Sequence, residues 1–256
     1  DAGNQVSFSW SAGDTGGSPI TAQVLTPIRS GAPLGPVSLG AGDSAYAMAA
    51  EDGATYSFSI SVSNKLGSGP AATSGESPLV YSKPSAPTGV RADVVRNATT
   101  LYFDPPANTG GQAINSYEVL TSTGASIQNT SGGAVPGLTN GQPVSFQVRA
   151  NNGKAGDLSG SSAQVIPYGN IPIDGVTLST GNSRQDGFDI NWGAVPNSHG
   201  RTVTSVKVKV NDTEVSTANG GSYSATGLAC GQGYTVTLIA GDDGDGTGNP
   251  ASKSTT

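Results

Sequence analysis

The sequence has very little of the residue types that most catalytic and metal sites need. Among its 256 residues there is one cysteine, Cys230, and one histidine, His199. A single cysteine excludes a disulfide bond within the chain. A single histidine leaves almost nothing for a histidine-based metal site or catalytic triad. The composition therefore argues against most classes of enzyme.

Charge and long apolar runs are also scarce. Charged residues make up 12% of the chain, and 12 Lys and Arg stand against 18 Asp and Glu, for a formal net charge of −6. Such a balance offers no electrostatic footprint for nucleic acid or anionic lipid. No apolar run approaches the roughly 18 residues that a membrane-spanning helix needs. We therefore expect neither nucleic-acid binding nor direct membrane insertion.

Glycine and proline, by contrast, are plentiful, with 38 Gly and 16 Pro. They are not spread at random, because one pattern of an alternating strand, an aromatic residue and a turn-rich loop occurs three times. The three aromatic residues are Trp10, Phe103 and Trp192, which are 93 and 89 residues apart. A second set of markers is Tyr56, Val144 and Tyr234, spaced by 88 and 90 residues. These spacings predict three units of just under 90 residues each.

The apolar residues in each unit alternate with Ser, Thr and Gln, with a period of two. Val6, Phe8 and Trp10 form one such row, and Tyr56, Phe58, Ile60 and Val62 form another. This alternation is typical of antiparallel strands that bury one face and expose the other. Several such strands in 90 residues favour a two-sheet sandwich, and no segment favours a helix. We therefore predict an all-β protein of three tandem two-sheet sandwiches.

Proline-rich segments mark the predicted boundaries between units. YSKPSAPTGV begins at Tyr81 and PYGNIPIDGV begins at Pro167. Proline restricts the backbone and stiffens short linkers, so we expect the units to follow one another in an extended row. Tyr81 and Tyr168 occupy equivalent places and are expected to pack between neighbouring units. The predicted domains are 1–83, 84–168 and 169–256.

The motifs resemble tandem fibronectin type III domains of the bacterial kind. In that family a strand with a Trp is followed by a Pro-rich, Gly-Gly loop and an Ile-x-x-Tyr-x-Val strand, and a Gly-Leu turn precedes a corner Tyr by six residues. The second unit matches the first motif and the third unit matches the second motif, at the following positions: Phe103, Pro105, Pro106, Gly110, Gly111, Ile114, Tyr117, Val119, Gly227, Leu228 and Tyr234. The resemblance implies three tandem immunoglobulin-like β-sandwiches, a fold that serves adhesion modules, spacers and receptor segments alike.

Several positions depart from the family pattern. Val144 stands where the corner Tyr is expected, so the second unit loses the hydrogen bond of the tyrosine corner. Gln23 is a polar residue at a position predicted to face inward, where it needs a hydrogen-bond partner. The first unit has no counterpart of the segment Ala86–Val95, so its first strand is expected to be missing. That gap favours a piece of a longer array.

One loop of the third unit has the spacing of a calcium site. Within GDDGDGTGN, which begins at Gly241, oxygen-bearing side chains alternate at Asp243, Asp245 and Thr247. Alternate positions in such loops turn toward the same hard cation. The distal bidentate Glu of calcium loops has no counterpart, and the other units have unrelated loops at this place. The alternative to a calcium site is a solvated hairpin loop, and no other cofactor is predicted.

The remaining chemistry-bearing residues predict no catalytic site. Cys230 and His199 fall in loops that we expect at opposite ends of one sandwich, so the cysteine has no base beside it. The loop carboxylates belong to different units and no cleft is implied, which argues against a glycosidase pair. They are Asp43, Glu51, Asp52, Asp174, Asp242, Asp243 and Asp245.

Aromatic residues do not form an exposed sugar-stacking strip. Eleven of the 15 are predicted to face inward, Tyr223 among them. The other four, Tyr46, Tyr81, Tyr102 and Tyr168, are scattered. Asn97, Asn129 and Asn211 fit the glycosylation pattern N-x-S/T, which acts only in a suitable host.

Three functional interpretations stay open at this point. The first is a non-catalytic structural or adhesive array in a secreted or cell-surface protein, which acts as a spacer and weak binding module for a protein or surface glycan. The second is an accessory spacer, associated with carbohydrate, in a secreted glycoside hydrolase. The third is a phage tail or virion appendage protein. In each case the partners include neighbouring domains of a longer chain.

Overall fold

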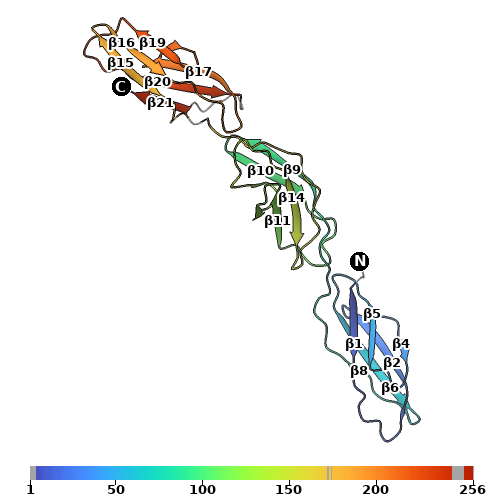
Figure 1. Cartoon of the computed structure of the whole chain (residues 1–256). Helices are drawn as coiled ribbons and strands as arrows, with labels where there is room; N and C mark the ends of the chain where they lie inside the picture. The colour runs from blue at the N-terminus through green and yellow to red at the C-terminus, as the bar shows by residue number, and fades with distance from the viewer. Residues whose placement is uncertain (1–3, 172, 174, 244–250, 256) are drawn as a thin grey trace. The chain divides into compact units, whose positions relative to one another are not determined.

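The computed structural model describes residues 4–171, 173 and 175–243, and the backbone of residues 251–255. The described residues form β-strands and no α-helix (Figure 1). None of them lies in a helix long and apolar enough to cross a membrane. The prediction of an all-β fold is confirmed.

The first pair of sheets follows from the alternating rows around Trp10 and Tyr56. One sheet has two antiparallel strands, β1 and β5, which lie side by side in Figure 1. The other has the order β3-β2-β6-β7, with β4 also paired to β2 and β8 to β6. The strands are β1 (Gln5–Ser9), β2 (Ile20–Arg29), β3 (Ala32–Pro33), β4 (Val37–Leu39), β5 (Ala45–Ala49), β6 (Tyr56–Asn64), β7 (Gly67–Ser68) and β8 (Ala72–Thr73).

In the second and third pairs of sheets, the sheet that corresponds to β1-β5 has three strands, and the other sheet has three or four. The second pair has the orders β13-β10-β9 and β12-β11-β14. Its strands are β9 (Thr88–Val95), β10 (Ala98–Asp104), β11 (Ser116–Thr121), β12 (Ser126–Gln128), β13 (Gly133–Ala134) and β14 (Phe146–Asn151). The third pair has the orders β15-β16-β19 and β18-β17-β20-β21. Its strands are β15 (Leu178–Arg184), β16 (Gly187–Trp192), β17 (Val203–Val210), β18 (Thr213–Ser216), β19 (Gly221–Ala225), β20 (Val236–Asp242) and β21 (Ala251–Thr255).

By its internal contacts the chain divides into two compact units. Unit 1 comprises Asp1–Thr88, Pro105–Glu118 and Val148–Ser159, and unit 2 comprises Gly89–Asp104, Val119–Gln147 and Gly160–Thr256. The first pair of sheets thus belongs to unit 1 and the third to unit 2, while residues of the second pair contribute to both. The domain boundaries after residues 83 and 168 stay a prediction.

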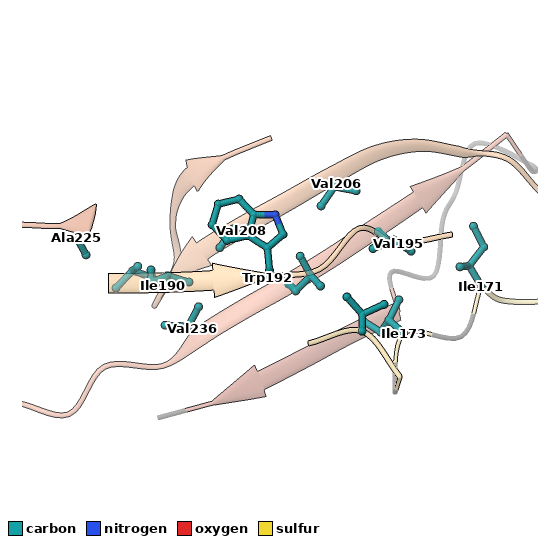
Figure 2. Close-up of a cluster of buried hydrophobic side chains, with 13 residues drawn as sticks. Ile171, Ile173, Ile190, Trp192, Val195, Val206, Val208, Ala225 and Val236 are labelled. Carbon is teal, nitrogen blue, oxygen red and sulfur yellow. The ribbon is translucent and has the colours of Figure 1, made fainter. Parts of the chain in front are cut away.

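The core of the third pair of sheets forms between two alternating apolar rows. Trp192 of β16 is only 4% exposed, and Figure 2 shows it among Val206 and Val208 of β17, with Ile190 farther along β16. Its indole nitrogen donates to the carbonyl of Ala218 at 3.0 Å, so the one polar atom of the ring is satisfied. Burial of such a row from both sheets defines a β-sandwich.

The core of the first pair of sheets is aromatic and contains one buried amide. The ring of Phe58 lies 5.1 Å from that of Phe8 and 5.9 Å from that of Trp10. Gln23 is 3% exposed; its Oε1 accepts from the Trp10 indole at 2.9 Å, and its Nε2 donates to three carbonyls of the loop after β4. The partner predicted for an inward Gln23 is therefore present.

Tyrosine corners are present in the first and third pairs of sheets. The Tyr56 hydroxyl accepts a hydrogen bond from the backbone N–H of Glu51 at 2.8 Å, and the Tyr234 hydroxyl accepts one from Ala229 at 2.8 Å. Val144 has no hydroxyl, and it exchanges backbone hydrogen bonds of 2.9 Å with Val165. The tyrosine corner predicted at Tyr234 is therefore present, and its hydrogen bond is lost at Val144 as predicted.

One aromatic residue on the inward face is only partly covered. Tyr223 lies on β19, which pairs with β16 alone, and its side chain is 37% exposed. Its cross-strand neighbour is Ile190, but the exposure pattern of β19 leaves only its last residue, Ala225, buried. An edge strand that covers one end of a small core can expose an aromatic residue that alternation alone places inside.

Candidate functional site

Many hydrogen bonds and close backbone contacts outside the hydrophobic cores lie around Tyr81 and Tyr168. We name these two regions the Tyr81 junction and the Tyr168 junction. The Tyr81 junction lies within unit 1 and consists of residues 80–85 with the turns that they touch. The Tyr168 junction lies within unit 2 and consists of residues 166–170 with their turns. Both contain the tyrosines predicted to pack between neighbouring repeats.

A pair of glycines meets backbone to backbone at each junction. At the Tyr81 junction, a Cβ atom on Gly111 would overlap the backbone nitrogen of Gly53. At the Tyr168 junction, a Cβ atom on Gly200 would lie 3.1 Å from the backbone of Gly141. All four have positive φ, between 76° and 84°, where a side chain is strained. The approach of the two turns therefore depends on glycine at these positions.

The hydrogen bonds around the glycines are also repeated. Gly53 donates to the carbonyl of Val80 at 2.8 Å, and Gly141 donates to that of Pro167 at 2.8 Å. One residue after each tyrosine, the chain binds the turn that carries the other glycine: Ser82 donates to Gly110 at 2.9 Å and Gly169 donates to His199 at 3.3 Å. His199 adopts φ of 53° where Gly110 has 74°. Two junctions far apart in the sequence thus share one backbone design.

A cation covers the tyrosine ring at each junction. The Lys154 ammonium lies 4.5 Å from the centre of the Tyr81 ring and donates to the Tyr81 carbonyl at 2.5 Å. The Arg201 guanidinium lies 3.2 Å from the centre of the Tyr168 ring, and that of Arg96 lies 6.0 Å from it. These are cation–π arrangements. A cation over a ring competes with a sugar for that face of the ring.

A buried polar group completes each junction, and its chemistry differs. Asn152 is fully buried; its Nδ2 donates to the carbonyls of Ser82 at 2.8 Å and Thr109 at 2.7 Å, and its Oδ1 accepts from Lys154 N–H at 3.0 Å. In the Tyr168 junction, Asp242 accepts two hydrogen bonds from the Arg96 guanidinium, at 2.7 and 2.8 Å. The side chains of this ion pair are 11% and 6% exposed.

The Tyr81 junction borders a polar groove of about 720 Å³. Each charged side chain that lines it has a partner: Lys83 pairs with Asp157 at 2.6 Å, Lys154 donates to the Tyr81 carbonyl, and Asp52 accepts from Ser82 and Asn4. The groove offers hydroxyl, amide and carbonyl groups, but its carboxylates already have partners. This arrangement suits structure better than acid–base chemistry.

The predicted calcium loop is only partly described. Asp245 and Thr247 lie outside the described residues. Asp243 accepts a hydrogen bond from Thr202 N–H at 3.0 Å and lies 3.8 Å from the Arg201 guanidinium. In the described ranges, no three His, Cys, Asp or Glu side chains are grouped so that they could hold a metal ion. The calcium site stays a prediction.

The other candidate residues are placed in turns and ion pairs. Cys230 is an exposed free thiol, and the His199 ring contacts Ser198 at 3.3 Å. Asp43 accepts from Gly40 N–H at 2.7 Å and Glu51 pairs with Arg29. Asp174 lies outside the described residues, as does Asp245. The loop carboxylates that the structure describes therefore each bind a different neighbour.

One carboxyl group is strongly perturbed, and its neighbours explain why. The pKa of Asp189 lies well below its ordinary value because Arg184 donates a hydrogen bond to it at 2.8 Å, with further donors from Ser224 and Asn182. The same bond raises the pKa of Arg184. Structural ion pairs also shift pKa values. The pKa of Asp189, on the sheet of β15, β16 and β19, is therefore explained by its ion pair and does not mark a catalytic site.

Comparison with known proteins adds a structural likeness. No family model matches the chain. The chain is similar to the crystal structure of domains FN1–FN3 of chicken CNTN1, with 16% sequence identity and a TM-score of 0.33, over 98% of this chain and 93% of that one.

The glycine pairs and buried groups at the junctions were missed by sequence reasoning, although their positions repeat. Gly111 and Gly200 each follow the marker residues Phe103 and Trp192 by eight positions. Asn152 and Asp242 likewise follow Val144 and Tyr234 by eight positions. Alignment of the three repeats on their aromatic markers therefore contains the signal, but nothing in one sequence says that two turns touch.

Proposed function

We propose that the chain is a non-catalytic structural array of fibronectin type III-like modules. It acts as a spacer and weak binding module in an extracellular or cell-surface protein. The observation that carries this proposal is the repeated junction. The Gly53–Gly111 and Gly141–Gly200 contacts and their flanking hydrogen bonds occur at equivalent positions in successive repeats. A chain that repeats its connections as well as its sandwiches is suited to spacing and alignment.

The organisation of the polar groups supports the same proposal. Buried polar groups at the junctions, Asn152 and Arg96 with Asp242, bind other parts of the chain through short hydrogen bonds. A carboxylate that acts as a general acid or base needs access to substrate and a pKa near the working pH. The perturbed carboxyl of Asp189 has a depressed pKa and an arginine partner, which keeps it ionised and engaged.

Small-angle scattering of the whole chain in solution tests the spacer role. A single compact domain of 256 residues has a radius of gyration of about 18 Å. A spacer is expected to give a clearly larger value and a distance distribution with a long tail. A radius near 18 Å, or measurable hydrolysis of polysaccharides by the purified chain, would overturn the proposal.

A further inference from the structure

Strand β5 leaves one edge of its sheet unpaired. β5 pairs with β1, and no other described strand pairs with it. The equivalent strands β13 and β19 also end their sheets, because β9 and β15 join on the far sides of β10 and β16. A strand added beside β1 would therefore leave this edge of β5 unchanged. The open edge of β5 is a property of the repeat.

The backbone of β5 presents hydrogen-bonding groups at the open edge. Ala50 N–H donates to the Asn4 carbonyl at 2.8 Å, and the register with β1 runs without a shift, so even-numbered residues of this segment face β1. Because successive residues of a strand direct their N–H and C=O groups to opposite edges, Ala45, Ala47 and Ala49 direct theirs to the open edge. These three residues offer a template for one more antiparallel strand.

The strand itself lacks the features that protect natural edge strands. The sequence of β5 is AYAMA, without proline, glycine or charge. The equivalent strand β13 has only two residues, Gly133–Ala134, and β19 begins at Gly221, which has a φ of 154°. Short strands, charges and proline discourage further pairing at an edge, and glycine weakens a strand. Of the three equivalent edges, that of β5 is the longest without glycine.

The two faces of β5 offer different surfaces to a neighbouring strand. Tyr46 and Met48 pack against the core of the first pair of sheets but are only half-buried. Ala45, Ala47 and Ala49 point to the other face and are exposed. Side chains of a strand alternate between the faces of a sheet. A strand that fits this edge therefore has apolar residues beside Tyr46 and Met48 and small polar residues beside the alanines.

Acidic residues flank β5 at both ends. Asp43 and Glu51 stand just outside the segment that bonds to β1. Each has one partner in the first repeat, Gly40 N–H and Arg29 respectively, and each keeps further acceptor capacity. Two copies of β5 paired about Ala47 would set Asp43 of one copy against Glu51 of the other, which is unfavourable. The charges thus favour a partner strand with basic ends over a second copy of the chain.

We propose that the open edge of β5 binds an extended peptide segment with basic ends as an additional antiparallel strand. The partner has Lys or Arg opposite Asp43 and Glu51, and between them aliphatic residues alternate with small polar ones. Backbone hydrogen bonds to Ala45, Ala47 and Ala49 supply the affinity, and the end charges with the aliphatic row supply the selectivity. This site deepens the proposed weak-binding role, and its failure would leave the spacer role, which scattering tests, untouched.

The test titrates the synthetic peptide KVTVTVTVK into the whole chain. We expect saturable binding, with amide chemical-shift changes centred on residues 45–49 rather than on β19, whose ends carry no acidic residues. The matched peptide EVTVTVTVE should bind about tenfold more weakly, because its ends face Asp43 and Glu51. A form of KVTVTVTVK that is N-methylated at its three threonines should bind no better than EVTVTVTVE, because those amides pair with β5.

Two protein variants match these peptides. Ala47→Pro removes an N–H at the open edge and leaves the bonds to β1 in place, so it should lose about tenfold in affinity for KVTVTVTVK. Glu51→Lys should weaken the binding of KVTVTVTVK and strengthen that of EVTVTVTVK, whose Glu faces position 51 in an antiparallel pair. Both variants should keep the far-UV circular dichroism of the parent chain. If Ala47→Pro does not fold, Glu51→Lys and the control peptides still decide the matter.

Several outcomes would overturn the proposal. They are the absence of saturable binding at millimolar KVTVTVTVK, equal binding of this peptide and its two controls, chemical-shift changes centred on β19, and affinities that Glu51→Lys does not change. A concentration-dependent dimer of the chain that Ala47→Pro abolishes would also overturn it, and would assign the edge to a second copy.

Discussion

Asn152 and Asp242 occupy the same position in two repeats and solve the same problem with different chemistry. Each follows its repeat's corner position, Val144 or Tyr234, by eight residues. Asn152 donates to two carbonyls and accepts one N–H, so a neutral amide satisfies its surroundings. The side chain of Asp242 has no N–H group to donate, and its carboxylate instead accepts two hydrogen bonds from the Arg96 guanidinium. The repeat thus conserves a buried polar contact while its charge varies.

The first repeat supplies a third version of this position. Asn64 follows Tyr56 by eight residues, donates to the Thr15 carbonyl at 2.9 Å, and accepts Leu66 N–H at 2.8 Å. The local part of the motif, an amide that binds the turn after it and a nearby loop, is therefore independent of any junction. Asn152 also donates to the carbonyl of Ser82, in the segment that follows Tyr81. Asn152 thus makes the loop contacts that Asn64 makes and a junction contact in addition.

The largest effect is expected from removal of the charge of Arg96. Arg96→Met keeps much of the side-chain volume but leaves the buried Asp242 carboxylate without its bidentate partner. Loss of one member of a buried ion pair costs about 3–5 kcal/mol. We expect a decrease of that size in the free energy of unfolding in urea, followed by tryptophan fluorescence on a Trp10→Phe background in which Trp192 is the one tryptophan.

The double variant Arg96→Met with Asp242→Asn sharpens the comparison. It installs at position 242 the neutral amide that position 152 already uses, and it should recover most of the lost stability. A double variant as unstable as Arg96→Met alone would show that the ion pair, rather than the absence of an uncompensated charge, stabilises this junction.

The next largest effect is expected at the glycine pairs. Gly111→Ala places a methyl group against the Gly53 backbone and should cost about 2–3 kcal/mol from overpacking and backbone strain together. Gly200→Ala, with a nearest contact of 3.0 Å, should cost less. Calorimetric unfolding of the whole chain measures both.

A matched control separates strain from contact. Gly31 has the same φ of 83° as Gly111, but a methyl group there would meet nothing within 4 Å. Gly31→Ala should therefore cost only the backbone term, about 1–2 kcal/mol. Equal losses for Gly31→Ala and Gly111→Ala would argue that the two turns of the Tyr81 junction do not touch in solution.

Removal of the Asn152 amide should have an intermediate effect. Asn152→Ala leaves the carbonyls of Ser82 and Thr109 without this donor in a buried site, which costs about 1–3 kcal/mol. Asn64→Ala is the control, because Asn64 makes the same loop contacts at a half-buried position. Calorimetry should show a smaller shift for Asn64→Ala. A larger shift there would place the stabilising contact in the loop rather than at the junction.

The smallest effects are expected at the tyrosine faces. Lys154→Met should lower the stability by no more than about 1 kcal/mol, because an exposed cation on a ring contributes little. Arg201, whose side chain is 17% exposed, should contribute more to Tyr168, and Arg201→Met should cost up to about 2 kcal/mol. A larger loss for Lys154→Met than for Arg201→Met in urea unfolding would contradict the expectation that the more buried cation contributes more.

Much of the fold was predictable because alternation and turn residues are local properties. The rows that end at Trp10, Phe103 and Trp192 became β1, β10 and β16 or the residues beside them. The hydroxyl of each corner tyrosine binds the backbone five residues earlier, so a short motif contains both partners. Gln23 could be identified as a buried amide in need of partners, but the three carbonyls it reaches lie 17 to 20 residues away in sequence. Their identity depended on how the loop after β4 folds.

The sequence by itself determined the all-β class, the repeated strand pattern, the corner tyrosines and the scarcity of cysteine and histidine, since each depends on composition or on spacing along one chain. Tertiary structure alone decided that Gly53 meets Gly111 and that Arg96 reaches Asp242 across 146 residues. These are relations between segments far apart in sequence, which the local periodicity of a strand or turn does not encode.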